Sequence, residues 1–163
     1  MVAVDADSGD TRWLTFVKAD PAPESITGDE TPISTGVAVV RNRFANGPGV
    51  AGTRDGDVCA FDPEDGDTQW RVSVTDDGAV GAVDTTEDHV VAVTSTGRVV
   101  LLSPEDGGVE ARPLFVERRW ENRCGLVSEY VQGVVATERA IWVSLEDGLY
   151  RIPMATVRER SSF

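Results

Sequence analysis

The feature that most constrains how this chain can fold is an internal repeat. Residues 3–13 and residues 60–70 agree in register at an alanine, two aspartates, a glycine, a threonine and a tryptophan. Residues 101–111 form a weaker third copy, which keeps the turn and Gly107 but lacks the first aspartate and the tryptophan. A recurring segment of this kind indicates a supersecondary unit that is built several times and stacked on its own copies.

Each unit is predicted to be a short β-meander. The clearest one spans residues 79–116 and contains apolar runs at 80–83, 89–94 and 98–102, separated by turn residues. A glycine stands directly before a short apolar strand at Gly56, Gly97 and Gly148. Short continuous apolar runs are typical of strands that are covered on both faces, and no segment shows a helical stripe of useful length. The chain is therefore predicted to be all-β with almost no helix.

The pattern Ala-x-Asp-x-x-x-Gly-x-x-x-Trp resembles the tryptophan-docking motif of the PQQ-like, quinoprotein-type β-propeller repeat. It is matched in full at Ala3, Asp5, Gly9 and Trp13 and again at Ala60, Asp62, Gly66 and Trp70. The resemblance implies a partial β-propeller of about three to four antiparallel four-stranded blades. It also implies a structural role for the motif, in which the glycine permits close backbone approach and the indole packs on the adjoining blade. We expect blade-docking residues at these eight positions and at Gly56, Gly97, Gly107 and Gly148.

We expect residues 1–163 to form a single propeller domain. The expected parts are a blade remnant at 1–17, a connecting loop at 18–36, and blades at about 37–74, 79–116 and 126–157. Closed propellers of the family have more blades, so the resemblance implies a fragment of a larger propeller, a mis-started reading frame or a degenerate small relative. Uncovered sheet faces at the ends of such a stack favour self-association or the binding of further blades.

The charge of the chain is strongly acidic. It has 28 acidic residues against 15 basic ones, a formal net charge of −13, and Lys18 as its single lysine. Such a surface is typical of halophilic, haloarchaeal proteins, because molar salt shortens the Debye length to about 3 Å and screens the repulsion. An ordinary acidic mesophilic domain is the alternative. The charge argues against nucleic acid as a partner, and no apolar run reaches the roughly 18 residues that a membrane span requires.

No cofactor or metal site is predicted. The family resemblance suggests pyrroloquinoline quinone, which quinoprotein dehydrogenases hold with a vicinal disulfide and calcium, but Cys59 and Cys124 lie far apart in the sequence. Closely spaced carboxylates at residues 5–10 and 62–67 suggest a calcium loop, yet their spacing does not match an EF-hand. We expect Asp5 and Asp62 instead to accept backbone hydrogen bonds in Asx turns.

Two further groups are candidates for chemistry. His89 is the sole histidine, and its position beside a turn at the start of a strand predicts an exposed side chain. One basic segment with an aromatic residue could contact a partner, at Arg118, Arg119, Trp120 and Arg123. A solvated loop with internal ion pairs is the simpler interpretation of that segment.

These observations predict a non-enzymatic β-propeller scaffold for protein–protein interaction or assembly, which presents loops to a protein partner or to further blades of the same propeller. The alternative is a fragment of a PQQ-dependent quinoprotein oxidoreductase. The prediction rests on the resemblance and on the lack of a visible catalytic constellation, because a fold does not by itself determine a function. The N-terminal residues lack a basic region followed by an apolar stretch, so no signal peptide is predicted and a cytoplasmic location is expected by default.

Overall fold

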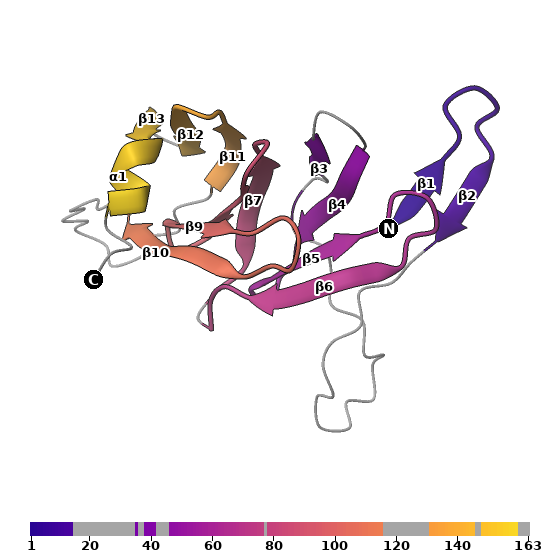
Figure 1. Ribbon diagram of the computed structural model, residues 1–163, viewed down its shortest axis with the longest axis horizontal. Coiled ribbons are helices and arrows are strands. Elements are labelled where there is room, and N and C mark those ends of the chain that lie inside the picture. Colours follow the sequence, from indigo (N-terminus) through magenta and orange to yellow (C-terminus); the bar gives the residue numbers. More distant parts are fainter. Residues whose placement is uncertain are drawn as a thin grey trace, which may run out of the picture.

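The computed structural model describes residues 1–14, 35, 38–41, 46–76, 78–115, 131–145 and 148–159, and they form four antiparallel sheets (Figure 1). The strands of the first two sheets are β1 (Val2–Val4) and β2 (Thr11–Leu14), then β3 (Ala38–Arg41), β4 (Asn46–Gly52), β5 (Asp57–Phe61) and β6 (Thr68–Ser73). Those of the last two are β7 (Val80–Thr85), β8 (Val90–Thr94), β9 (Arg98–Leu102) and β10 (Val109–Phe115), then β11 (Val131–Ala136), β12 (Ala140–Leu145) and β13 (Gly148–Pro153).

The sheets follow one another along the longest axis of the molecule, in the order of the sequence. In every sheet neighbouring strands are also consecutive in the chain, so each sheet is a meander. Figure 1 shows the β1–β2 hairpin at the right end and the β11–β13 sheet at the left end, with the two larger sheets between them. This arrangement is a partial β-propeller, as the sequence predicted.

Tight turns with glycine join the central strands of the two four-stranded sheets. Gly56 (φ 90°) and Gly97 (φ 82°) both lie in the left-handed region, which costs glycine little. In each turn a buried threonine hydroxyl accepts a backbone N–H from four residues onward: Thr53 from Asp57 (3.0 Å) and Thr94 from Arg98 (3.0 Å). The two turns therefore share both their threonine and glycine residues and their backbone geometry.

Gly148 differs from these two glycines, although the sequence suggested the same role. It is the first residue of β13, pairs with Leu145 and does not have a positive φ. An added Cβ there would meet only Tyr150, at 4.0 Å, among the described residues. Gly148 differs because its connection is shorter. Two residues separate Leu145 from Gly148, whereas three residues separate Thr53 from Asp57.

The β7–β10 sheet is covered on both faces. Val90 and Ala92 of β8 belong to an apolar cluster shared with the β3–β6 sheet. Val91 and Val93, which point the other way, belong to a second cluster shared with the β11–β13 sheet. Alternate side chains of a strand face opposite sides, so a strand that is apolar at every position must lie between two layers. The sequence-based prediction of strands covered on both faces is confirmed for β8.

Among the described residues the last sheet has three strands, where four are expected from the sequence. Its three strands are followed by a short helix, α1 (Met154–Glu159), which was not predicted. Met154 and Val157 of α1 are buried in the cluster that joins this sheet to its neighbour. After Pro153 the sequence lacks the glycine turn that leads into a fourth strand elsewhere, and an apolar pair at i and i+3 favours a helical turn on the core. No helix of the described part is long and apolar enough to cross a membrane.

Candidate functional site

Three turns of the same construction connect the third and fourth strand positions of successive units. We call residues 5–10, 62–67 and 103–108 the docking turns. In each, the N–H of the first residue donates to the carbonyl of the sixth (2.8 Å), and the glycine N–H donates to the carbonyl of the first (2.9–3.0 Å). The glycine of each turn has a positive φ: Gly9 (76°), Gly66 (82°) and Gly107 (73°).

The aspartates of the first two docking turns hold the backbone, as Asx turns do. Oδ1 of Asp5 accepts the N–H groups of Asp7 and Ser8 (both 3.0 Å), and Oδ1 of Asp62 accepts the N–H of Glu64 (2.8 Å). Hydrogen bonds from Ser8, from the Arg12 side chain and from Asp7 lower the pKa of Asp5 to about 2. Among the described residues, no three His, Cys, Asp or Glu side chains are grouped so that they could hold a metal ion.

Each of two docking turns carries an indole from the preceding unit. A Cβ added at Gly66 would lie 2.6 Å from Cε3 of Trp13, and one at Gly107 would lie 2.7 Å from Cε3 of Trp70. Trp13 Nε1 donates to the carbonyl of Pro63 (3.0 Å). Trp70 Nε1 donates to the carbonyl of Pro104 (3.1 Å). The indole therefore lies on a bare glycine and is oriented by one hydrogen bond at its edge.

Small residues stand beside these indoles. Ala3 pairs with Trp13 across the β1–β2 hairpin, and Ala60 pairs with Trp70 across β5 and β6. Ala60 is fully buried, so a larger side chain there would collide with the packed sheet. Phe61 extends the first contact, because its ring meets that of Trp13 edge-on, with centroids 5.8 Å apart at 70°.

No described residue supplies such an indole to the docking turn at Gly9. No described atom lies within 4 Å of a Cβ added at Gly9, although the turn has the same backbone as the other two. The four motif residues of this first copy therefore divide into two groups. Ala3 and Trp13 face the next sheet, while Asp5 and Gly9 build a turn on which no described indole lies.

His89 is not exposed, contrary to the sequence-based prediction. Only 12% of its side chain is accessible, and its Nδ1 lies 2.6 Å from Oε2 of Glu110. The backbone N–H of His89 donates to the hydroxyl of Thr86 (3.1 Å). The prediction failed because β10, two strands away in the same sheet, brings Glu110 to the histidine, and a single sequence does not show this contact. The basic segment Arg118, Arg119, Trp120 and Arg123 lies outside the described residues, as does Cys124.

Cys59 lies in β5, where the sequence placed it in a strand. Its thiol is buried and free, and burial raises its pKa to about 11, an effect that Arg71 opposes and Asp57 supports. The two charged residues form an ion pair across β5 and β6. A protonated, inaccessible thiol is inert, so Cys59 serves as a core residue.

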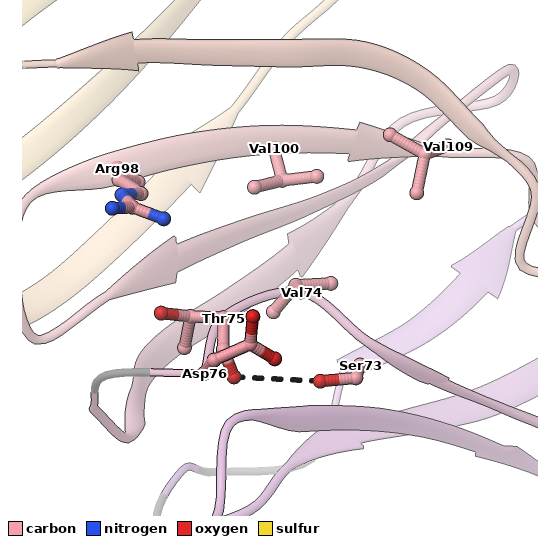
Figure 2. Close-up of a pocket in the computed structure, with 7 residues that line it drawn as sticks. All are labelled: Ser73, Val74, Thr75, Asp76, Arg98, Val100 and Val109. Atoms are coloured by element: carbon pink, nitrogen blue, oxygen red, sulfur yellow. Dashed lines mark hydrogen bonds between the residues drawn. The ribbon is translucent and has the colours of Figure 1, made fainter.

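A cavity of about 290 Å³ lies between the end of β6 and the strands β9 and β10. Figure 2 shows Arg98 on one side of it and Asp76 with Thr75 on the other, and Ser73 Oγ donates to the carbonyl of Thr75 (3.4 Å). Sequence reasoning missed this cavity, because its residues come from two different units and share no motif.

Solved structures similar to this chain are propeller-family and designed proteins. The structure of BamB from Moraxella catarrhalis matches with a TM-score of 0.59 and 18% identity, over 96% of this chain and 45% of that one. The computationally designed Ika8 protein matches at 0.55 and 15%, over 91% and 38%. The computationally designed Ika4 protein matches at 0.50 and 13%, over 82% of this chain and 99% of that one. At these identities the likeness shows the fold.

The chain spans less than half of the Moraxella BamB chain that it resembles. Among proteins with curated descriptions, none matches it significantly. The model of one protein family matches residues 1–141, which is most of the sequence. The chain thus belongs to the PQQ-like repeat family that is described as outer membrane protein assembly factor BamB.

Proposed function

We propose that this chain is a non-enzymatic β-propeller scaffold for protein–protein interaction or assembly. The family description names an assembly factor, and the fold is that of a BamB propeller. In this proposal the motif residues hold sheet to sheet and take no part in chemistry. Trp13 and Trp70 then act as the anchors of the stack, since a buried aromatic ring contributes a large share of packing energy.

The observation that carries the proposal is the apolar surface at the two ends of the stack. Val2, Val4 and Leu14 of the β1–β2 hairpin are more than half exposed, and so are Val135 and Leu149 of the last sheet. In β5 and β9, by contrast, almost every apolar side chain is buried against a neighbouring sheet. Exposed apolar faces of this kind mark surfaces that bind other proteins.

The chain has a net charge of −13 on 163 residues. At low ionic strength its carboxylates repel one another and destabilise the folded state, and high salt screens this repulsion. We infer that the protein functions in a salt-rich environment, and that it acts together with further blades, since it spans only part of the BamB chain it resembles.

A binding experiment tests the scaffold function. The full chain, immobilised at about 1 M KCl to screen charge, is exposed to extracts of its source cells, and captured proteins are then purified and titrated against it in solution. The matched variant carries Val2→Thr, Val4→Thr and Leu14→Thr, which keep strand propensity but add hydroxyls. Loss of affinity with an unchanged melting temperature supports the proposal, and equal affinity for both chains contradicts an apolar docking face on the hairpin.

A second titration addresses the oxidoreductase alternative, which the family description does not favour. The purified chain is mixed with pyrroloquinoline quinone and calcium while the quinone absorbance is followed. We expect no saturable change. Stoichiometric binding would overturn the proposal that the chain takes no cofactor.

A further inference from the structure

The cavity beside β9 lies where the β3–β6 sheet meets the β7–β10 sheet. Its volume of about 290 Å³ is at the lower end of the range of small-molecule pockets. Val100 of β9 belongs to the apolar cluster that joins the two sheets, and Val74 and Val109 pack against that cluster. These three valines form the apolar part of the cavity (Figure 2).

The polar part of the cavity has two charged side chains of opposite sign. Figure 2 shows the guanidinium of Arg98 and the carboxylate of Asp76 on opposite sides of it. Arg98 is half-buried and Asp76 is exposed, so the cavity opens to solvent at the carboxylate. The formal charges of the two groups cancel, although the whole chain has a net charge of −13.

Both sides of the cavity are held in place by hydrogen bonds of the fold. The N–H of Val74 donates to the carbonyl of Gly56 (2.9 Å), which fixes the segment after β6 against the turn before β5. Thr75, the next residue, is buried. On the other side the N–H of Arg98 donates to the hydroxyl of Thr94 (3.0 Å). The cavity is therefore preformed, and a ligand would pay little to order the chain.

The positive charge of Arg98 is not a requirement of the repeated fold. Asp57 has the same position in the preceding unit, since its N–H also donates to a threonine hydroxyl four residues earlier. There the side chain is acidic and forms an ion pair with Arg71. The stacked sheets thus accept either sign of charge at this position, so stacking does not account for the guanidinium of Arg98.

The two charges of the cavity discriminate among classes of ligand. A simple anion beside Arg98 would also meet the carboxylate of Asp76, and a simple cation beside Asp76 would also meet the guanidinium. A molecule with an ammonium and a carboxylate on neighbouring atoms satisfies both sides with charge-assisted hydrogen bonds. A free α-amino acid is such a molecule, and an apolar side chain on it suits the three valines.

We propose that this cavity binds a free apolar α-amino acid in its zwitterionic form. The carboxylate of the ligand accepts hydrogen bonds from Arg98, its ammonium donates to Asp76, and its side chain packs on the valines. A volume of about 290 Å³ is that of roughly ten water molecules, which suits a ligand of the size of leucine. The inference goes beyond the proposed scaffold function and does not depend on it, because the cavity lies between two stacked sheets and not at the exposed ends.

A titration of the full chain with L-leucine tests the site, with the amide chemical shifts of residues 73–76 and 98–100 as the readout. It is made at about 1 M KCl, where partly buried charge pairs are screened much less than exposed ones. We expect these shifts to saturate together with a Kd of about 10 mM or tighter, as a modest ligand efficiency gives for a ligand of this size.

Three analogues of leucine each remove one group that the cavity is proposed to bind. N-acetyl-L-leucine lacks the ammonium, L-leucinamide lacks the carboxylate, and glycine lacks the apolar side chain. Each should bind at least about tenfold more weakly than leucine, because a buried or half-buried partner loses its contact.

Two variants assign the two charges of the ligand to their partners. Asp76→Asn should weaken leucine at least about tenfold and remove most of the difference between leucine and N-acetyl-L-leucine. Arg98→Gln should do the same for leucine and L-leucinamide. Asp88→Asn is the matched control, because Asp88 is exposed and does not line the cavity. Denaturant titrations check the fold of each variant, and the exposed position of Asp76 keeps the test valid if Arg98→Gln fails to fold.

Three results would overturn the inference. One is a titration in which leucine shifts none of the cavity amides. Another is equal affinity for leucine and N-acetyl-L-leucine, since the cavity would then bind a carboxylate alone, such as the end of a partner's chain. The third is equal affinity of the wild type and Asp76→Asn for leucine. The scaffold function is tested separately, by the partner binding of the β1–β2 hairpin variant, so either proposal can fail while the other stands.

Discussion

At the scale of single residues, the contact that recurs is an indole on a bare glycine. Trp70 is 8% exposed and lies on Gly107, at the boundary between two sheets. The ring belongs to the apolar cluster that joins the β3–β6 and β7–β10 sheets, so its removal leaves a cavity that rigid strands cannot fill. Trp70 is thus a residue of the sequence repeat that packs between two neighbouring sheets.

Trp70→Ala is expected to lower the free energy of unfolding by about 3–5 kcal/mol, the cost of truncating a buried aromatic ring. The matched control is Trp142→Ala, because Trp142 is half-buried on an outer face and contacts Arg151. Its loss should be about 1 kcal/mol. Denaturant titrations measure both, and equal losses would contradict the docking role of Trp70.

The buried thiol of Cys59 makes stability depend on alkaline pH. Its pKa is raised from 9.0 to about 11 in the folded chain, chiefly by burial, so folding favours the neutral thiol. This contribution, about 2–3 kcal/mol for a shift of two units, is complete below pH 9 and is lost as the pH rises toward 11. Urea titrations give the free energies of unfolding of the wild type and of Cys59→Ala. Between pH 8 and pH 11 this free energy should fall further for the wild type, because only the wild type loses the contribution of the thiol. Equal falls for the two proteins would refute this role of Cys59.

At the scale of strands and turns, local patterns could be predicted and contacts between units could not. The apolar run of β8 and the glycines of the docking turns are visible in the sequence, because alternation and turn chemistry are local. Helix α1 was missed since a six-residue helix owes its existence to the burial of Met154 and Val157. The contact of His89 with Glu110 involves another strand, which a single sequence does not show. Gly148 differs from Gly56 because two residues rather than three separate the paired positions there.

Adjacent positions of β8 provide a test of its burial on both faces. Val90 and Val91 are both fully buried but belong to different clusters. Val90→Ala and Val91→Ala should each cost about 2 kcal/mol, from two lost methyl groups and the cavity they leave. Val135→Ala, at a position 59% exposed, should cost less than about 0.5 kcal/mol. If either β8 variant melted like the wild type, one face of the strand would be uncovered.

At the scale of the whole molecule, the net charge of −13 determines the response to salt. Repulsion among carboxylates acts over the Debye length of about 10 Å at 0.1 M and is largely removed at 1 M. Few attractive pairs oppose it, since basic residues are scarce and exposed pairs contribute at most about 1 kcal/mol each. The melting temperature should therefore rise as KCl is added. Chloride is the suitable anion, because sulfate would also strengthen apolar burial. A flat or falling curve would exclude the halophilic interpretation.

Among the described residues the chain is an open stack of blades, in which the central sheet is covered on both faces and the two terminal sheets expose apolar side chains. In a stacked array each unit is stabilised by its neighbours, so the middle unit should open least often. Native-state hydrogen exchange of the full chain measures this directly. We expect the slowest exchange at the paired amides of β8 and β9, faster exchange in the β11–β13 sheet, and the fastest exchange in the β1–β2 hairpin. Uniform protection from the hairpin to the last sheet would contradict an open stack.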